Sequence, residues 1–451
     1  MKIKITKKRR NLLIAAVIII GVGIWMATRW HAWFGLPPEP PYTIPNEPCR
    51  ILLTMGNEDE LSRNIGWQCG DSVQQSWVEL MDADSLITRI DAQGEVYQSR
   101  SGKGAFYVAR LRKLKYAQHY QYRVATGGKF SEWHAFSTQG KNDELNLMYV
   151  GDVQDTLSGK TNSVLRHAMQ LNPKTQMLIC GGDLVERPSD NYWQEGFDGL
   201  DSIRQAMPIL ACTGNHDYMK SLPDTVEHRF SLVFSYFLDS HVDRNHLYTF
   251  KMGNAQLFFL DSTRNLFCIW SQRQWLKEQL EKSTAKWKIL VTHHPLYSIK
   301  GTMNQMIDRW MLAGMIQEMG IDLVLQGHEH AYARMTEEED GEKVPPLYTV
   351  SHCSPKTYRI KFDDDRYDKY GVYCRFYQTV YTQGDTLNMC TYEADNYTLY
   401  DHVQIVKHPN QKPQIIDLGK NIPEKLEFKG DENNKKDREF KERIEEYKAK
   451  K

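Results

Sequence analysis

The feature that most constrains the fold is a series of five short apolar runs, each ending in residues of the kind that bind metals. They read LMYVGD, MLICGGD, PILACTGNHD, KILVTHH and DLVLQGHEH, within residues 147–330. Short apolar strands separated by helical stretches indicate a sheet with both faces buried. In such a sheet ligands bind beyond the carboxyl ends of the strands, so the five clusters are expected at one rim. The helical stretches are predicted near 160–171, 190–206, 271–283 and 303–319.

The polar residues of these clusters have the chemistry of a divalent transition-metal site, whose usual ligands are carboxylate, amide oxygen and imidazole. A single Asp after a strand is more often a helix cap than a ligand. Five successive clusters, with His328 and His330 on one side of an extended stretch, favour a metal site. The candidates are Asp152, Gln154, Asp183, Asn215, His216, His293, His294, His328 and His330.

The N-terminus predicts a membrane segment in residues 1–35. Six positive charges in the first ten residues precede Leu12–Thr28, 17 residues without a charge, which is near the lower limit for crossing a bilayer. We expect a retained signal anchor, with the basic flank in the cytoplasm and the rest exported to the periplasmic or extracytoplasmic side. The alternative is a cleaved signal peptide and a secreted protein. A buried core helix is a third interpretation.

Three further regions follow from local composition. Residues 36–48 include six prolines, which predicts a stiff spacer holding the rest away from the membrane. Residues 49–138 contain six or seven short runs of strand-forming residues, which indicates an antiparallel β-sandwich. Residues 147–407 hold the five clusters. The charged tail, 408–451, is expected to be a solvated helix or disordered, with no function implied.

Overall composition excludes some classes of protein. Lys plus Arg and Asp plus Glu both number 57, and this balance argues against a nucleic-acid partner. The eight cysteines include no Cys-x-x-Cys pair, which argues against a cysteine zinc site. Cys49 with Cys69, and Cys374 with Cys390, are candidate disulfides of an exported domain, and the pairing stays open.

The order GD, GGD, GNHD, HHP, GHEH resembles that of the calcineurin-like metallophosphoesterases. The continuation GHEHAYAR and His293-x-Pro are similar to the purple acid phosphatase branch. Residues 49–138 resemble the fibronectin-III-like domain of those enzymes, through Trp67, Tyr120-x-Tyr122 and Trp133-x-x-Phe136. The resemblance implies a four-layer αββα catalytic domain after an all-β sandwich.

The same resemblance implies two metal ions, among Fe, Mn and Zn, joined by Asp183 and a bridging hydroxide. One would be held by Asp152, Asp183 and His330. The other would be held by Asp183, Asn215, His293 and His328. His216 matches the catalytic histidine, which contacts phosphate and protonates the leaving oxygen.

Two positions depart from the family pattern. Gln154 stands where the superfamily has His, and Glu186 where purple acid phosphatases have the Tyr that binds ferric iron. Our hypothesis is that the Gln154 amide fills the first gap, with Glu186 as a ligand or beside one. Oxygen donors favour Mn or Fe(II), which argues against a purple ferric centre. The resemblance and position at the rim make His294, Arg187 and Tyr332 weaker substrate-binding candidates, together with Lys356 and Tyr358.

The predicted function is a metal-dependent phosphomonoesterase that acts on a small phosphate ester or nucleotide. The alternatives are a phosphodiesterase or nucleotide pyrophosphatase of the same superfamily, and a degenerate binding protein without activity. The membrane is the other expected partner, through the N-terminal helix. Natural substrate, metal identity and oligomeric state are left open by the sequence.

Overall fold

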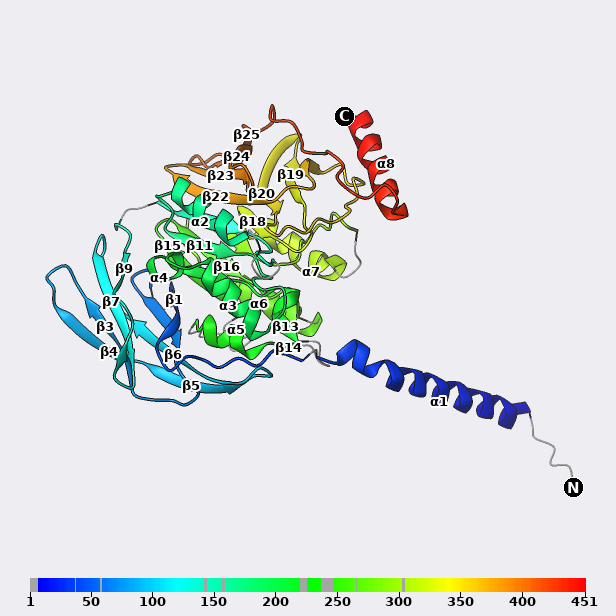
Figure 1. The fold of residues 1–451 in the computed structure, drawn as a ribbon. Coiled ribbons are helices and arrows are strands. Elements are labelled where there is room, and N and C mark those ends of the chain that lie inside the picture. The colour runs from blue at the N-terminus through cyan, green and yellow to red at the C-terminus, as the bar shows by residue number, and fades with distance from the viewer. Residues whose placement is uncertain are drawn as a thin grey trace, which may run out of the picture.

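The computed structural model describes residues 7–36, 38–56, 59–141, 144–155, 159, 161–219, 225–236, 246–264, 266–301 and 305–451. A long helix, α1 (Lys7–Phe34), projects from a body that has a β-sandwich at one end and a larger α/β part at the other (Figure 1). The predicted basic flank begins in residues 1–6, which lie outside the described residues.

The sandwich is built from two antiparallel sheets, as predicted. Buried side chains that include Leu53, Ile65, Val78 and Tyr122 fill the space between them. The structure has nine strands here instead of six or seven. β4 and β5 are largely exposed and lack an apolar alternation, so the sequence pattern does not reveal them. The first sheet is β1 (Cys49–Met55), β2 (Arg63–Gln68), β6 (Lys103–Leu111) and β5 (Gln93–Gln98); the second is β4 (Ile87–Asp91), β3 (Ser76–Met81), β7 (His119–Thr126), β8 (Lys129–Phe130) and β9 (His134–Ser137).

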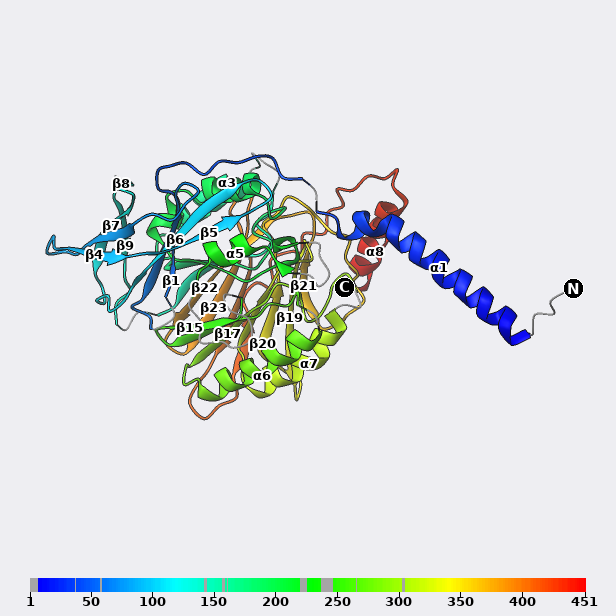
Figure 2. The same ribbon diagram turned by 90° about the horizontal axis from the view of Figure 1, so that it is seen from below.

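The α/β part contains two seven-stranded sheets stacked face to face (Figure 2). The first has the order β12-β11-β10-β22-β23-β24-β25 and the second β15-β16-β17-β18-β20-β19-β21. The bounds are β10 (Asn146–Val150), β11 (Met177–Cys180), β12 (Ile209–Ala211), β22 (Phe376–Gln383), β23 (Thr386–Glu393), β24 (Leu399–Val406) and β25 (Gln414–Asp417), then β15 (Tyr248–Met252), β16 (Ala255–Phe259), β17 (Trp287–Val291), β18 (Leu323–Gln326), β19 (Tyr332–Glu339), β20 (Glu342–Val350) and β21 (Tyr367–Gly371).

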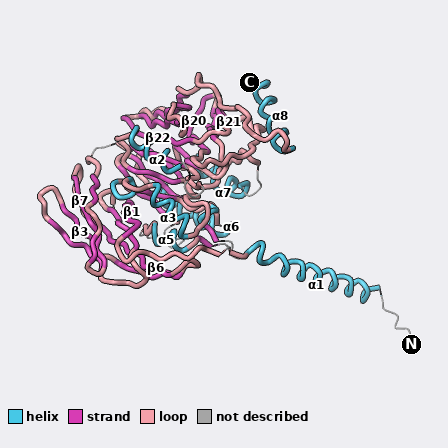
Figure 3. The backbone as a smooth tube through the Cα atoms, viewed as in Figure 1, coloured by secondary structure: helices cyan, strands magenta, loops and turns pink. Residues whose placement is uncertain are grey.

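Alternating side chains of the central strands show that four layers are stacked. In β17, Ile289 and Val291 belong to the core between the two sheets, whereas Leu290 packs with the helices on the outer face. The predicted αββα class is therefore confirmed. The helices are α2 (Thr161–Leu171), α3 (Asp190–Gly199) and α4 (Ile203–Ala206) beside the first sheet, and α6 (Leu266–Lys282) and α7 (Gln305–Glu318) beside the second (Figure 3).

The helix limits differ in part from the predicted ones. The stretch predicted as one helix over 190–206 is broken, because Ser202 has a φ of 67° and separates α3 from α4. α6 begins five residues earlier than expected. The predicted starts at 160 and 303 lie outside the described residues. Shorter elements near the site are the 3-10 turn Asn215–Asp217, β13 (Tyr218–Met219), β14 (Thr225–Val226) and α5 (His228–Val233).

The charged C-terminal stretch is not simply a solvated tail. β25 extends the first sheet to Asp417, past the expected limit at 407. α8 (Lys435–Lys450) packs one side on the second core, with Phe440 and Ile444 buried. These residues, with Tyr447, are spaced as one helical face, a stripe that the many charges obscure in the sequence.

The proline-rich segment is not a free spacer, because several of its side chains bind to the body. Glu39 and Ile44 are buried, and the Glu39 carboxylate lies 2.8 Å from an Arg229 nitrogen and 2.7 Å from an Arg100 nitrogen. The Tyr42 hydroxyl donates to Gln194 at 2.8 Å. The segment is therefore bound along the body, because two guanidinium groups neutralise a carboxylate that local composition had placed in solvent.

α1 holds the apolar stretch Asn11–Trp30, which has a mean hydropathy of 2.2 and is wholly exposed. This helix is long and apolar enough to act as a signal sequence or an anchor, which directs the chain to the secretory pathway. No disulfide bond forms among the eight cysteines, all of which lie in the described residues, so neither suggested pair is bonded.

Candidate metal centre

The predicted ligands come together where the parallel strands of both sheets end. Asp152 and Asp183 follow β10 and β11, and His293 follows β17 of the facing sheet. Asp152, Asp183 and His328 have φ values of 43°, 50° and 70°, in the left-handed region that non-glycine residues seldom adopt. Such conformations cluster at functional sites, where the surrounding structure holds them.

The first half of the centre surrounds His330. Its Nε2 lies 3.3 Å from Asp152 Oδ1 and 3.3 Å from the Gln154 amide nitrogen. The other Asp152 oxygen accepts the His328 backbone N–H at 2.5 Å. Asp152, Asp183 and His293 each offer a ligand atom, all within 4.8 Å of one another.

The second half surrounds His293, whose Nε2 is 3.4 Å from Asp183 Oδ2 and 3.2 Å from Asn215 Oδ1. His328 Nδ1 lies 2.8 Å from the same Asn215 oxygen. On the far side of the His293 ring, Nδ1 donates to the Gly181 carbonyl at 2.9 Å. That contact directs Nε2 at the cluster, the usual way in which an outer hydrogen bond orients a metal-binding histidine.

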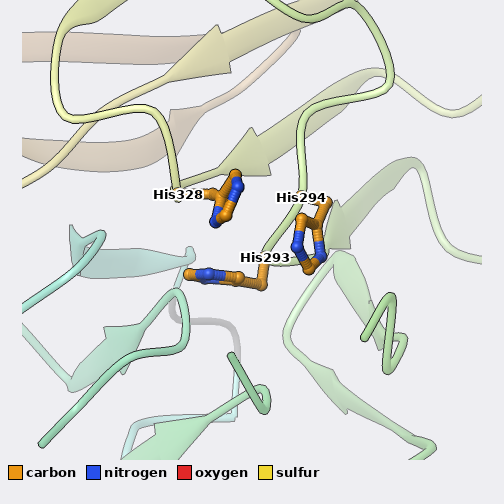
Figure 4. Close-up of side chains that lie close together, drawn as sticks. All are labelled: His293, His294 and His328. Carbon is orange, nitrogen blue, oxygen red and sulfur yellow. The ribbon is translucent and has the colours of Figure 1, made fainter. Parts of the chain in front are cut away.

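His294 lies among the ligand candidates. Its ring centroid is 4.2 Å from that of His328, and Ser262 contacts its Nδ1 at 3.0 Å. Figure 4 shows the rings of His293 and His294, from the loop after β17, gathered with that of His328. One nitrogen of each ring lies within 4.8 Å of the others. The sequence suggested a contact with substrate, whereas this geometry groups His294 with possible ligands.

Burial controls the charge of these rings. It lowers the pKa of His294 to about 3, helped by the neighbouring His293. Burial, with His294 and His293, also lowers the pKa of His328. Burial opposes the charged form of His293 as well, but the Asp183 carboxylate outweighs it and raises that pKa to about 10. His294 and His328 are thus neutral near pH 7, the form in which imidazole binds metals.

His216 is held with one ring nitrogen toward the cluster. Its Nδ1 donates to the Glu186 carbonyl at 2.7 Å, and its Nε2 lies 4.0 Å from Asp183 Oδ2. The backbone beneath it is braced by Asp217, which accepts the N–H groups of Asp183 and Gly214. The His216 side chain is 27% exposed, so its free nitrogen can meet a ligand entering from solvent.

Three of the sequence-based candidates lie outside the cluster. Glu186 forms an ion pair with Lys356, so its carboxylate is engaged away from the ligand group. Arg187 is exposed and makes no side-chain hydrogen bond or ion pair with the described residues. Tyr332 is not a substrate contact: its side chain is fully buried in β19, and its hydroxyl donates to Asp401 because the GHEH motif runs directly into a core strand.

Two side chains complete the mouth of the site. The Tyr358 ring stacks on His330 with centroids 4.3 Å apart, and Lys300 Nζ lies 4.0 Å from the Tyr358 centroid. Glu329 accepts the N–H groups of Ile299 and Lys300, which ties this loop to the GHEH loop. The position of Tyr358 after a strand was a signal in the sequence. Nothing local marks Lys300, because a contact 29 residues away positions it.

The residues present fit a pair of metal ions. Asp152 Oδ1 and Gln154 Oε1 are buried, and neither accepts a hydrogen bond within the described part of the chain. Buried polar atoms nearly always have a partner, so two such oxygens beside convergent imidazoles indicate a cation as the missing partner.

Comparison with known proteins agrees with this geometry. Residues 145–332 match the family model described as calcineurin-like phosphoesterase, and residues 48–138 match the purple acid phosphatase N-terminal domain. Purple acid phosphatase 18 of Arabidopsis thaliana is 26% identical over 315 residues, covering 66% of this chain and 68% of that protein. Fe(3+)-Zn(2+) purple acid phosphatase 12 of the same plant is 24% identical, covering 67% and 66%.

The solved structure of purple acid phosphatase PPD1 from yellow lupin seeds has the same fold, with a TM-score of 0.68 at 14% identity. The match covers 80% of this chain and 75% of that one. The chain spans about two thirds of the length of the curated relatives it matches. The chain is therefore similar to the calcineurin-like phosphoesterases over residues 145–332 and to the N-terminal domain of the purple acid phosphatases over residues 48–138. Its class is that of a metal-dependent phosphoesterase, a hydrolase.

Proposed function

We propose that this chain hydrolyses phosphate monoesters at a two-metal centre. The observation that carries the proposal is the convergence of two ligand groups on Asp183. Asp152, Gln154, Asp183 and His330 would hold one ion. Asp183, Asn215, His293 and His328 would hold the other, with His294 beside them. A bound metal pair supplies an activated water and neutralises charge on the oxygens of an in-line displacement.

His216 is the proposed general acid. Its Nδ1 proton is committed to the Glu186 carbonyl, which leaves Nε2 to carry and donate the second proton. A ring fixed in this way, beside the cluster and open to solvent, can protonate the leaving oxygen of an ester.

Lys300 favours a monoester over a diester as substrate. Its ammonium lies over the Tyr358 ring and forms no ion pair with a described carboxylate. A positive charge at the mouth attracts a dianionic monoester more strongly than a monoanionic diester. A phosphodiesterase or nucleotide pyrophosphatase is the alternative that the substrate test distinguishes.

The metals proposed are Mn or Fe(II), from the oxygen-rich first site. The printed name of one relative includes iron and zinc, so a mixed pair is the alternative. Glu186, in the position of the family's tyrosine, is paired with Lys356 and is not a phenolate. We therefore expect a colourless protein, and strong visible absorption by an iron-loaded sample would contradict this.

We further propose that α1 is retained as an anchor. Its apolar stretch is exposed throughout, and the possible cleavage sites after Ala27 and Ala32 have tryptophan at the −3 position. The mass of the protein extracted from membranes tests this, because cleavage would remove the first 27 or 32 residues.

Turnover by the full chain in detergent tests the activity. p-Nitrophenyl phosphate and its bis ester are supplied with Mn, Fe(II), Zn or Mg in turn. Asp183→Ala should lower the rate by more than a hundredfold. Loss of a residue that only hydrogen-bonds to a metal ligand already lowers metal affinity or activity by about 10–100-fold, and Asp183 would bind the metals directly. Asp365→Ala, at an exposed carboxylate, is the matched control. A folded protein without metal-dependent turnover of either ester would favour the non-catalytic binding protein.

A further inference from the structure

We propose that the edge of the body bearing the metal centre lies against the lipid bilayer, and that the exposed apolar starts of α6 and α7 contact its surface. The inference rests on the retention of α1 proposed above. Three independent features point to this edge: an apolar helix face, the course of the parallel strands and the bound proline-rich segment.

The first feature is the outer face of α7. Trp310 is 84% exposed, Met306 63% and Ile307 42%, and all three lie within the first two turns. The opposite face packs into the core through Leu312 and Ile316. A helix that is apolar on both faces usually has a second apolar partner, and exposed clusters of this kind mark interaction sites.

The second feature is the topology, which places these residues at the metal edge. α6 and α7 connect parallel strands, so each begins where the preceding strand ends, at the edge where His293 follows β17. Trp270, the fifth residue of α6, is 57% exposed. The two helices touch just beyond these residues, where Arg273 donates to the Met311 carbonyl at 2.8 Å.

The third feature is the bound segment that leads to α1. Glu39 pairs with Arg229, which also pairs with Asp190 at the start of α3. α3 likewise follows a parallel strand, β11, so Glu39 lies at the same edge. Glu39 comes five positions after Phe34, the end of α1, so the two residues are at most roughly 18 Å apart. In Figures 1 and 2, α1 leaves the body at the end away from the sandwich, where α7 also lies.

A lipid surface is the partner that fits these features. Tryptophan is enriched where one end of its ring is apolar and the other wet, as at a membrane interface, and Met and Ile complete an apolar face. A helix that enters the bilayer a few residues from the body would keep this face beside the headgroups. Phosphate groups carried on lipid headgroups would then face the mouth of the site.

The experiment uses the full chain in phosphatidylcholine nanodiscs that contain an acyl-chain diazirine lipid. After irradiation, lipid adducts are mapped by mass spectrometry. We expect adducts on α1 and on 305–318. Leu86 and Ile87, on β4 in the distant sandwich, are 66% and 55% exposed and form an internal control that should remain nearly free of adducts.

Two double variants test whether the adducts on α7 depend on its exposed apolar face. Met306→Glu with Trp310→Glu should remove the α7 adducts and preserve those on α1. Leu86→Glu with Ile87→Glu should change neither the adducts on α7 nor those on α1. Adducts on α1 with α7 no higher than β4 would overturn the inference. Adducts on neither would overturn both the anchor and the docking.

Hydrolysis of p-nitrophenyl phosphate, measured on the same samples, separates this inference from the proposed function. The α7 variant should retain its turnover of this water-soluble ester, because none of the altered residues is in the ligand cluster. Wild-type protein without turnover would contradict the proposed function, whereas its lipid adducts would still support or overturn the docking.

Discussion

Single side chains explain how this site differs from its family pattern. Where the family has a metal-binding tyrosine, Glu186 turns to Lys356, and the ring that covers His330 is Tyr358 from another loop. Lys300 Nζ lies over that ring, 4.0 Å from its centroid. The mouth therefore carries two ammonium groups and one aromatic ring, with Lys356 and Tyr358 from one segment and Lys300 from another, distant one.

Lys300→Gln should change the preference between substrates. We expect kcat/KM for p-nitrophenyl phosphate to fall about tenfold, because a hydrogen bond to a charged group contributes about 1.5–3 kcal/mol. The bis ester, with one charge less, should lose markedly less. Lys277→Gln, at an exposed lysine of α6, should affect neither substrate. Equal losses for both esters would show that Lys300 does not discriminate by charge.

At the scale of elements, α7 combines an exposed apolar face with a buried acid. Burial raises the pKa of Asp308 to about 7. In the unfolded chain this group has its ordinary pKa of 3.8. Between these two values the unfolded chain has released a proton that the folded protein keeps, so the free energy of unfolding falls as pH rises and stays low above pH 7.

Asp308→Asn should therefore stabilise the protein at pH 8, by up to about 4 kcal/mol, and have little effect near pH 4. Urea unfolding at several pH values measures this difference. Asp365→Asn, at an exposed position, is the control and should leave the free energy of unfolding unchanged both at pH 8 and near pH 4. A difference between wild type and Asp308→Asn that is the same at every pH would contradict the explanation.

At the scale of the whole molecule, buried charges join the N-terminal segment to both parts of the body. Arg229 of α5 contacts Glu39, Asp190 and Glu227. Asp190 in turn pairs with Arg50 of β1 in the sandwich, at 2.9 Å. These pairs make the orientation of α1 and of the sandwich depend on one network.

Arg229→Met should destabilise the protein by about 3–5 kcal/mol, because it leaves buried carboxylates without their partner. The segment 38–48 should also become sensitive to protease. Arg100→Met is a milder control, since Arg100 is 28% exposed and its pair with Glu39 is more solvated. Urea unfolding and limited proteolysis measure the two effects. An Arg229→Met protein as stable and resistant as wild type would exclude this network as the link.

The sequence by itself determined the class of fold and the identity of the candidate ligands, because both are local. Apolar runs of strand length fall between helical stretches, and each ends in its polar cluster, as at Asp183 and His293. The burial of Glu39 and of the Phe440 face, the removal of Tyr332 from the site, and the approach of Lys300 to Tyr358 were decided only by the tertiary structure. Each depends on a partner far along the chain, and neither composition nor periodicity reports which distant charge or apolar face will meet a given residue.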